Sequence, residues 1–287
     1  MRLGLHALGI GTGARREVID AVAIAAEATG FRSLWVGEHV VMVDRGASRY
    51  PYAPDGRIAV PADADWLDPM IALSFAAAAT RTIRVATGVL LVPEHNPVTL
   101  AKQAASLDRL SSGRLALGIG VGWSQEEFAA LGIPFERRGA RADEYVAAMR
   151  TLWRDEPASF NGEFVKFADI RVNPKPVRDG RIPIIVGGNS DAALRRAART
   201  GDGWYGFNLT DLAAARERIT RLRTLCQAAG REPSELDIAV ALAYPPGPDE
   251  HDELTELGVD ELVLVAAPPA DPAQADSWVR ALRQDSG

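Results

Sequence analysis

Short apolar runs alternate along this chain with longer segments whose apolar residues recur at helical spacing. The runs, which predict β-strands, cover residues 3–7, 33–36, 83–93, 114–120, 183–186, 204–207, 237–243 and 261–266. The segments that predict helices cover residues 15–29, 69–80, 97–110, 126–131, 138–154, 190–199, 211–229, 250–257 and 272–283. Nearly continuous apolar strands are typical of a parallel sheet that helices cover. A doubly wound sheet would also alternate, but eight strand–helix pairs favour an α/β fold of the (β/α)8 TIM-barrel type.

One stretch, residues 155–181, breaks this rhythm. Asn161-Gly162 lies between two short extended segments and signals a hairpin. Asn173-Pro174-Lys175-Pro176 cannot continue a helix. We therefore expect an inserted excursion before the fifth strand, within a single barrel domain that covers residues 1–287.

The strand at residues 83–93 carries two features that an ordinary core strand does not need. Thr87 places a hydroxyl inside the apolar run, and Gly88 lies in mid-strand. A glycine there often marks a bulge or the close approach of a ligand. A core strand that tolerates one glycine is the alternative.

Composition narrows the classes of protein that fit. The chain has 287 residues, a net charge of −6 and a sequence pI near 5.4, which argues against a nucleic-acid binder. Its apolar runs are too short to cross a membrane, and no signal peptide is evident at the start. Cys226 is the single cysteine, so an internal disulfide and a thiolate metal cluster are excluded. We expect a cytoplasmic protein that acts on a small molecule, without a nucleic-acid or membrane partner.

In a barrel, the residues that follow each strand meet at one rim, where active sites of this fold lie. The residues at this rim that could take part in binding or catalysis are His6, Glu38, His39, Thr87, Gly88, Glu94, His95 and the segments 118–123 and 187–190. His39, beside Glu38, is the best candidate for a general acid or base because imidazole titrates near neutral pH. A purely structural histidine is the alternative.

The histidines after three strands, His6, His39 and His95, also raise the alternative of a metal site. The first strand is not followed by a His-x-His pair, and neither the fifth nor the eighth strand is followed by a carboxylate or histidine. We predict no metal.

Two glycine-containing turns connect strands to helices. Gly187-Gly188-Asn189 precedes Ser190, a predicted helix cap, and fits an anion such as phosphate; a tight turn that needs a positive φ is the alternative. The segment at residues 118–122 lacks the full dinucleotide fingerprint, and we expect its glycines, Gly120 and Gly122, to make room beside a flat ligand. With no nucleophile elbow or P-loop, the rim suits a cofactor that brings its own reactivity.

A loop at residues 40–66, rich in aromatic residues and with Arg45, Arg49 and Arg57, is longer than compact domains usually contain. We expect it to cover the substrate, with its arginines near an anionic part of the cofactor.

Several of these motifs together resemble one family. They are Ser33-Leu34-Trp35-Val36-Gly37-Glu38-His39, Thr87–Pro93 with Asn96-Pro97, Ala101–Asp108, Ser112–Leu115, Gly118–Trp123 with Glu127-Phe128, Pro174-Lys175-Pro176, Pro183–Gly188 and Asp202-Gly203-Trp204. In order and spacing the chain resembles the bacterial-luciferase-like flavin and deazaflavin oxidoreductases, and within them the branch that uses coenzyme F420.

The resemblance implies a barrel with a flavin-like ring over the strand ends, backed by a non-proline cis peptide at Gly88-Val89 or one residue to either side. It implies that Gly187 and Gly188 take the cofactor phosphate. The predicted cofactor-binding residues are His6, Thr87, Gly88, Val89, Gly120, Gly122, Gly187, Gly188 and Asn189.

The resemblance also implies the chemistry. We expect an F420-dependent oxidoreductase that transfers hydride between the deazaflavin C5 and a small organic substrate, with His39 and Glu38 as catalytic residues. His39 matches the histidine of the family's acidic-His pair, where Glu38 replaces the usual Asp. Val121 stands where the sugar-phosphate branch has an acid, which argues against such a substrate. The alternatives are an FMN-dependent monooxygenase that uses reduced flavin and O2, and a cofactor-binding protein without chemistry. Because relatives are commonly dimeric, a homodimer fits.

Overall fold

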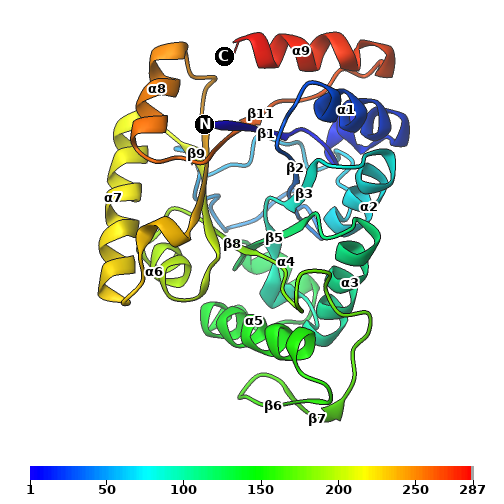
Figure 1. Ribbon diagram of the computed structural model, residues 1–287, viewed down its shortest axis with the longest axis vertical. Coiled ribbons are helices and arrows are strands. Elements are labelled where there is room, and N and C mark those ends of the chain that lie inside the picture. The colour runs from blue at the N-terminus through cyan, green and yellow to red at the C-terminus, as the bar shows by residue number, and fades with distance from the viewer. Residues whose placement is uncertain (286–287) are drawn as a thin grey trace.

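A closed barrel of parallel strands forms the centre of the computed structural model, which describes residues 1–285 (Figure 1). Its strands are β1 (Arg2–His6), β2 (Ser33–Val36), β3 (Arg84–Thr87), β4 (Leu90–Leu91), β5 (Leu115–Gly120), β8 (Ile184–Gly187), β9 (Gly203–Leu209), β10 (Asp237–Leu242) and β11 (Glu261–Val265). β1 pairs with both β2 and β11, so the first and last strands of the chain are neighbours.

The predicted strand at residues 83–93 is divided into β3 and β4. Both halves pair with β5, Val85 opposite Leu115 and Leu90 opposite Ile119. The nine strand segments of the sheet, with β3 and β4 counted as one, therefore give the eight strand positions of a (β/α)8 barrel within residues 1–285. The predicted fold class is confirmed.

Helices surround the barrel (Figure 1). They are α1 (Arg16–Ala28), α2 (Pro69–Ala79), α3 (Pro97–Leu110), α4 (Gln125–Ala130), α5 (Arg138–Arg154), α6 (Asp191–Thr200), α7 (Leu212–Ala228), α8 (Pro248–Glu256) and α9 (Ala275–Asp285). Their starts follow local chemistry: the Asp68 side chain accepts from the N–H of Ile71, and that of Ser190 from Ala193. The last helix differs from expectation because Pro272 opens a separate 3₁₀ turn before α9.

The excursion before the fifth barrel strand is an antiparallel hairpin of β6 (Ala158–Asn161) and β7 (Lys166–Ile170). It projects beside α5 at the lower end of the view in Figure 1. The predicted hairpin is confirmed, and it lies outside the barrel.

The inside of the barrel is packed. Trp35 and Tyr205 stack with ring centroids 4.7 Å apart. Alanines from β3, β5 and β10 leave room for these two rings. Closer to the start of the strands, Glu261 is fully buried and accepts from Trp35 Nε1 at 3.0 Å and from the Ser33 hydroxyl. The barrel interior is therefore filled by side chains, and active sites of this fold lie at the carboxyl ends of the strands.

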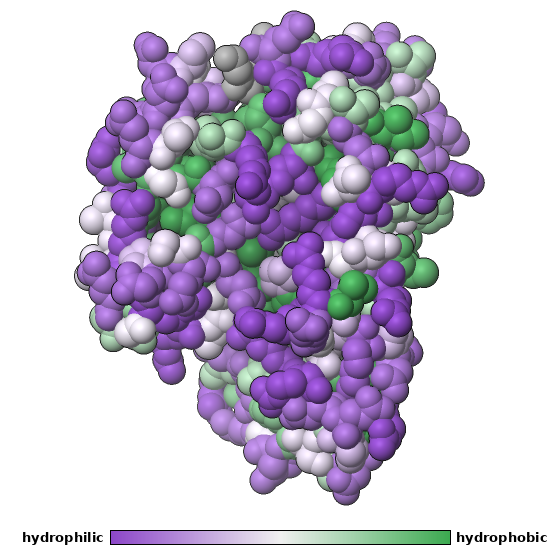
Figure 2. Space-filling view, viewed as in Figure 1, coloured by the Kyte–Doolittle hydropathy of each residue, from purple (hydrophilic) through white to green (hydrophobic). Residues whose placement is uncertain are grey.

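Most of the face in Figure 2 is hydrophilic, and its hydrophobic residues form small separate patches. Within residues 1–285, the helices include none with the length and apolar character needed to cross a membrane.

Candidate active site

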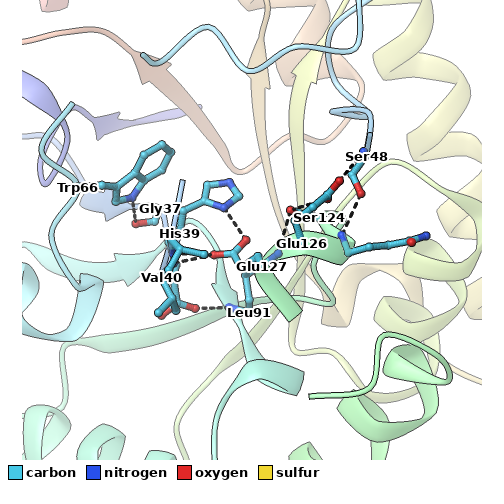
Figure 3. Close-up of polar contacts among 12 residues, drawn as sticks. Gly37, His39, Val40, Ser48, Trp66, Leu91, Ser124, Glu126 and Glu127 are labelled. Carbon is cyan, nitrogen blue, oxygen red and sulfur yellow. Dashed lines mark hydrogen bonds and ion pairs between the residues drawn. The ribbon is translucent and has the colours of Figure 1, made fainter. Parts of the chain in front are cut away.

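His39 and Glu127 form a buried pair at the rim of the barrel (Figure 3). His39 follows β2, and Glu127 lies in the first turn of α4, just after β5. His39 Nδ1 lies 2.8 Å from Glu127 Oε2, and the two side chains are 8% and 1% exposed. Glu127 Oε1 accepts from the N–H of Val40 at 2.7 Å, which fixes the carboxylate on the loop that carries the histidine. The rings of Trp66 and Trp123 pack against the imidazole in T-shaped arrangements, with centroids 4.9 and 5.7 Å away.

Glu38, adjacent to His39 in the sequence, has different partners. Its Oε2 accepts from the N–H of Leu91 at 2.5 Å, and its Oε1 lies 3.0 Å from His95 Nε2. Burial acts to lower the pKa of His95, but its hydrogen bond to Glu38 and the charge of that carboxylate raise it above the usual value. The structure thus brings Glu38 to His95 and Glu127 to His39, and the two adjacent residues do not act as one pair.

His6 is buried deeper in the rim than His39. Its Nδ1 lies 3.4 Å from the Tyr205 hydroxyl, and its ring borders Gly37 and Gly88. Burial lowers the pKa of His6 to about 4, so the ring is neutral at neutral pH.

The three rim histidines therefore contact three different partners. Among residues 1–285, no group of three or more His, Cys, Asp or Glu side chains is arranged to hold a metal ion.

The peptide bond between Gly88 and Val89 is cis, at the predicted position. The Val89 side chain lies between two glycines: a Cβ on Gly120 would be 2.7 Å from its Cγ2, and one on Gly187 would be 2.5 Å from its Cγ1. Thr87 is fully buried and donates its hydroxyl to the carbonyl of Gly118 at 2.6 Å. The threonine and the glycines thus shape the barrel wall around Val89, and direct contact with a ligand stays a prediction for them.

Gly122 also borders side chains of the protein itself. It has φ +76°, and a Cβ there would be 2.6 Å from Phe128 Cε2 and 2.9 Å from Glu94 Oε1. The room that this glycine leaves is thus used by an aromatic ring and a carboxyl group.

The turn after β8 offers free donors. Gly188 has φ +111°, as a tight turn requires, and its N–H donates to the carbonyl of Tyr205. The N–H groups of Ser190 and Ala192, at the start of α6, donate to no acceptor within the described part of the chain. Asn189 Nδ2 donates to the carbonyl of Phe207 at 2.8 Å, whereas its buried Oδ1 accepts from no group there. Free N–H groups at a helix start fit a phosphate, and a free amide oxygen fits a hydroxyl.

The loop at residues 40–66 covers this rim. Glu126 Oε1 accepts from the N–H groups of Ala47 at 2.6 Å and Ser48 at 3.1 Å. Figure 3 shows Ser48 beside Glu126 and Ser124 at the start of α4. We call these contacts of Glu126 with the loop the latch.

Aromatic rings line the inner side of this loop. Tyr50 packs against Trp123, with centroids 5.4 Å apart, and Tyr52 packs against Phe207 at 5.6 Å. Burial raises the pKa of both tyrosines. The rim under the loop is therefore mainly aromatic, with His39 as its neighbour.

From the sequence, Glu94 was expected at the rim, but Glu127 was not identified as the partner of His39. Glu127 lies 88 positions from its partner His39, and nothing in the local sequence indicates that pairing. Its place after the glycine-containing strand was the available signal, because residues there reach the rim.

The fold and the site define a class: a (β/α)8 barrel whose rim carries a buried histidine–carboxylate pair and a helix start with free N–H groups. A family model described as luciferase-like monooxygenase matches residues 4–285. The chain belongs to that family, and is therefore an enzyme of the flavin- or F420-dependent oxidoreductases and monooxygenases. The resemblance to this family seen in the sequence is confirmed, whereas the F420-using branch stays a prediction.

Similar proteins use both kinds of cofactor. The chain is 38% identical over 263 residues to the uncharacterized protein Rv0953c of Mycobacterium tuberculosis, covering 91% of each. It is 33% identical over 156 residues to an FMNH(2)-dependent dimethylsulfone monooxygenase of Pseudomonas putida, covering 53% of this chain and 42% of that protein. An F420-dependent secondary alcohol dehydrogenase in complex with an F420–acetone adduct superposes with a TM-score of 0.76 at 18% identity, covering 100% of this chain and 99% of that one.

Proposed function

We propose that this protein is an F420-dependent oxidoreductase that moves hydride between the deazaflavin C5 and a small, largely apolar organic substrate. The observation that carries the proposal is the buried His39–Glu127 pair at the rim. Hydride transfer to or from a carbonyl-type carbon needs a partner that gives or takes the accompanying proton, and this pair supplies one. The aromatic lining of the loop and rim supports an apolar substrate.

His39 and Glu127 would have different functions in this proton transfer. Because the Glu127 carboxylate accepts from Nδ1, the other ring nitrogen of His39, Nε2, is the one that exchanges a proton with substrate. Glu127 orients the imidazole through this hydrogen bond. The covering loop excludes water from the pair.

The cofactor would be held by the same rim. The free N–H groups of Ser190 and Ala192 would take its phosphate, and Asn189 Oδ1 a hydroxyl of its side chain. Neutral His6 and Val89 would support the ring. When bound, the deazaflavin supplies hydride chemistry at C5, which the protein's own side chains cannot provide.

An FMN-dependent monooxygenase that uses reduced flavin and O2 is the second candidate. The P. putida relative favours it. The two candidates place the same pair, turn and loop around a ring of similar shape, and differ in the cofactor that binds and in the uptake of O2.

His39→Ala tests the proposed role of the pair. We expect kcat for F420H2 oxidation, measured with a panel of small ketones and aldehydes, to fall by about 10²- to 10⁴-fold, while the Kd for F420 stays nearly unchanged. His251→Ala, on α8, is the matched control and should leave both unchanged. A loss of F420 affinity as large as the loss of turnover would contradict the role.

A further inference from the structure

Glu94 is a buried carboxyl group without a hydrogen-bond partner. It ends the 3₁₀ turn Val92–Glu94 after β4 and is 7% exposed. Both of its oxygens are buried, and neither has a partner among residues 1–285. Buried polar atoms in folded proteins are bonded as a rule, and a buried carboxylate without a donor is especially unfavourable. A neutral carboxylic acid fits this environment better.

The neighbours of Glu94 are the two carboxylates of the rim. Burial, followed by the charges of Glu127 and Glu38, raises the pKa of Glu94 to about 9. Glu127 binds His39 and Glu38 binds His95, so both other carboxylates already hold an imidazole. Each of these two carboxylates therefore has a hydrogen-bonding partner, which Glu94 lacks.

The other neighbours of Glu94 are a glycine, which leaves room for the carboxyl group, and an arginine that does not donate to it. Its Oε1 lies 2.9 Å from the position that a Cβ on Gly122 would take. Arg138 reaches the same strand end, but its Nε donates to the carbonyl of Gly122 at 3.0 Å. Its guanidinium lies over the Phe135 ring, 3.8 Å from the centroid, and within residues 1–285 neither oxygen of Glu94 has a hydrogen-bond partner.

We propose that Glu94 is a positioning residue that carries a proton at neutral pH, and that this neutral state preserves the hydrogen bond between Glu127 and His39. With Glu94 neutral, the three carboxyl groups hold two negative charges, each matched to a histidine. An ionised Glu94 would add a third charge to the cluster, and repulsion would disturb the Glu127–His39 pair. The role in turnover rests on the proposed function, whereas the protonation itself does not.

The proton can be detected without substrate or cofactor. In the infrared spectrum of the whole protein, we expect the C=O stretch of a buried carboxylic acid at pH 7, titrating with a midpoint near pH 9. The band should be lost in Glu94→Gln and in Glu94→Met, two neutral replacements of similar size, and kept in the exposed control Glu136→Gln. Absence of the band from the wild type, or its survival in both Glu94 variants, would overturn the proposal.

Thermal unfolding gives a second readout with a definite sign. A carboxyl whose pKa is higher in the folded state than in the unfolded chain costs stability increasingly as the pH rises above about 4.5, up to its folded pKa near 9. The Tm of Glu94→Gln relative to wild type should therefore rise between pH 5 and pH 9. A Tm difference that does not change with pH would contradict protonation.

Turnover then tests the effect on the pair. In the wild type, kcat should decline above pH 9, and in Glu94→Gln this alkaline decline should disappear. An alkaline decline that is the same in both proteins would overturn the positioning role. The infrared band stands whether or not F420 is the cofactor, so failure of the proposed function is distinguishable from failure of this inference.

Discussion

Burial and partners give the rim histidines different chemistry. His39 contacts a carboxylate and borders the covering loop, which suits proton exchange. His95 is held by Glu38, and the pKa of His95 is raised. His6 lies against Tyr205 without a carboxylate, and burial lowers its pKa to about 4. Three residues of one type thus lie in three different environments, which their immediate neighbours determine.

The low pKa of His6 leads to a pH-dependent stability. The folded protein keeps this ring neutral, while the unfolded chain takes up a proton near pH 6.5, so His6 costs stability as the pH falls from about 6.5 to about 4. The full effect is on the order of 3 kcal/mol. We expect the free energy of unfolding, measured in urea, to fall less steeply over this range in His6→Gln than in the wild type. Parallel pH curves for the two proteins would show that His6 is not neutral in the fold.

Local sequence identified His39 at a strand end but could not identify its partner. Glu38 is adjacent in sequence, yet it bonds to His95, 57 positions away. Pairings of this kind depend on how the strand ends converge, and no periodic pattern records them. The sequence also could not show that Glu94 lacks hydrogen-bond partners, because those partners depend on the fold and not on the residue type.

At the scale of secondary-structure elements, Val89, between β3 and β4, packs against the ends of β5 and β8. Its side chain fills the space left by Gly120 of β5 and Gly187 of β8. Gly120 was expected to make room beside a flat ligand and Gly187 to take a phosphate; in the structure the space next to each holds a methyl group of Val89, and their contact with a ligand stays a prediction. Small residues on neighbouring strands therefore set the shape of the wall behind the proposed ring site.

Substitution of one of these glycines should show the packing directly. Gly120→Ala places a methyl group 2.7 Å from Val89 Cγ2 and should destabilise the protein by about 1–3 kcal/mol. In the double variant with Val89→Ala, part of this loss should be recovered, a coupling of about 0.5–3 kcal/mol in urea unfolding. Gly247→Ala, with open space around it, is the control. Additive effects of the two changes would contradict the packing.

The latch determines how firmly the loop at residues 40–66 covers the rim. Hydrogen bonds, first from the Ser48 side chain and then from backbone N–H groups, lower the pKa of Glu126 to about 2. Because the ionised carboxylate makes these bonds, the latch holds at neutral pH and weakens as the pH falls from about 4.5 towards 2.

Glu126→Ala should therefore release the loop at neutral pH. We expect trypsin to cleave this variant at the exposed Arg45 and Arg49 about fivefold faster than the wild type. This factor corresponds to the loss of roughly 1 kcal/mol of hydrogen bonding that holds the loop closed. Glu136→Ala, another exposed glutamate, should cleave at the wild-type rate. Equal rates in all three proteins would show that Glu126 does not hold the loop.

At the scale of the whole molecule, the fold follows from the repeated strand–helix unit. Eight apolar strands alternating with helices predicted the barrel, and the structure closes it through β3 and β5. The hairpin of β6 and β7 was also predicted, because Asn161-Gly162 is a strong local turn signal. Element ends were less predictable: β9 extends from Gly203 to Leu209, beyond the predicted residues 204–207, since pairing with β10 continues past the apolar run. A homodimer and a cytoplasmic location stay predictions.

The central claim is that this rim binds F420 and uses it. A parallel titration of the purified protein with F420 and with FMN, followed by cofactor fluorescence, tests it most directly. We predict micromolar or tighter binding of F420, with FMN at least tenfold weaker, a difference of about 1.4 kcal/mol. Tight binding of FMN with weak binding of F420 would contradict the claim and favour the flavin monooxygenase, and binding of neither would remove the basis for the phosphate turn at Gly187 and Gly188.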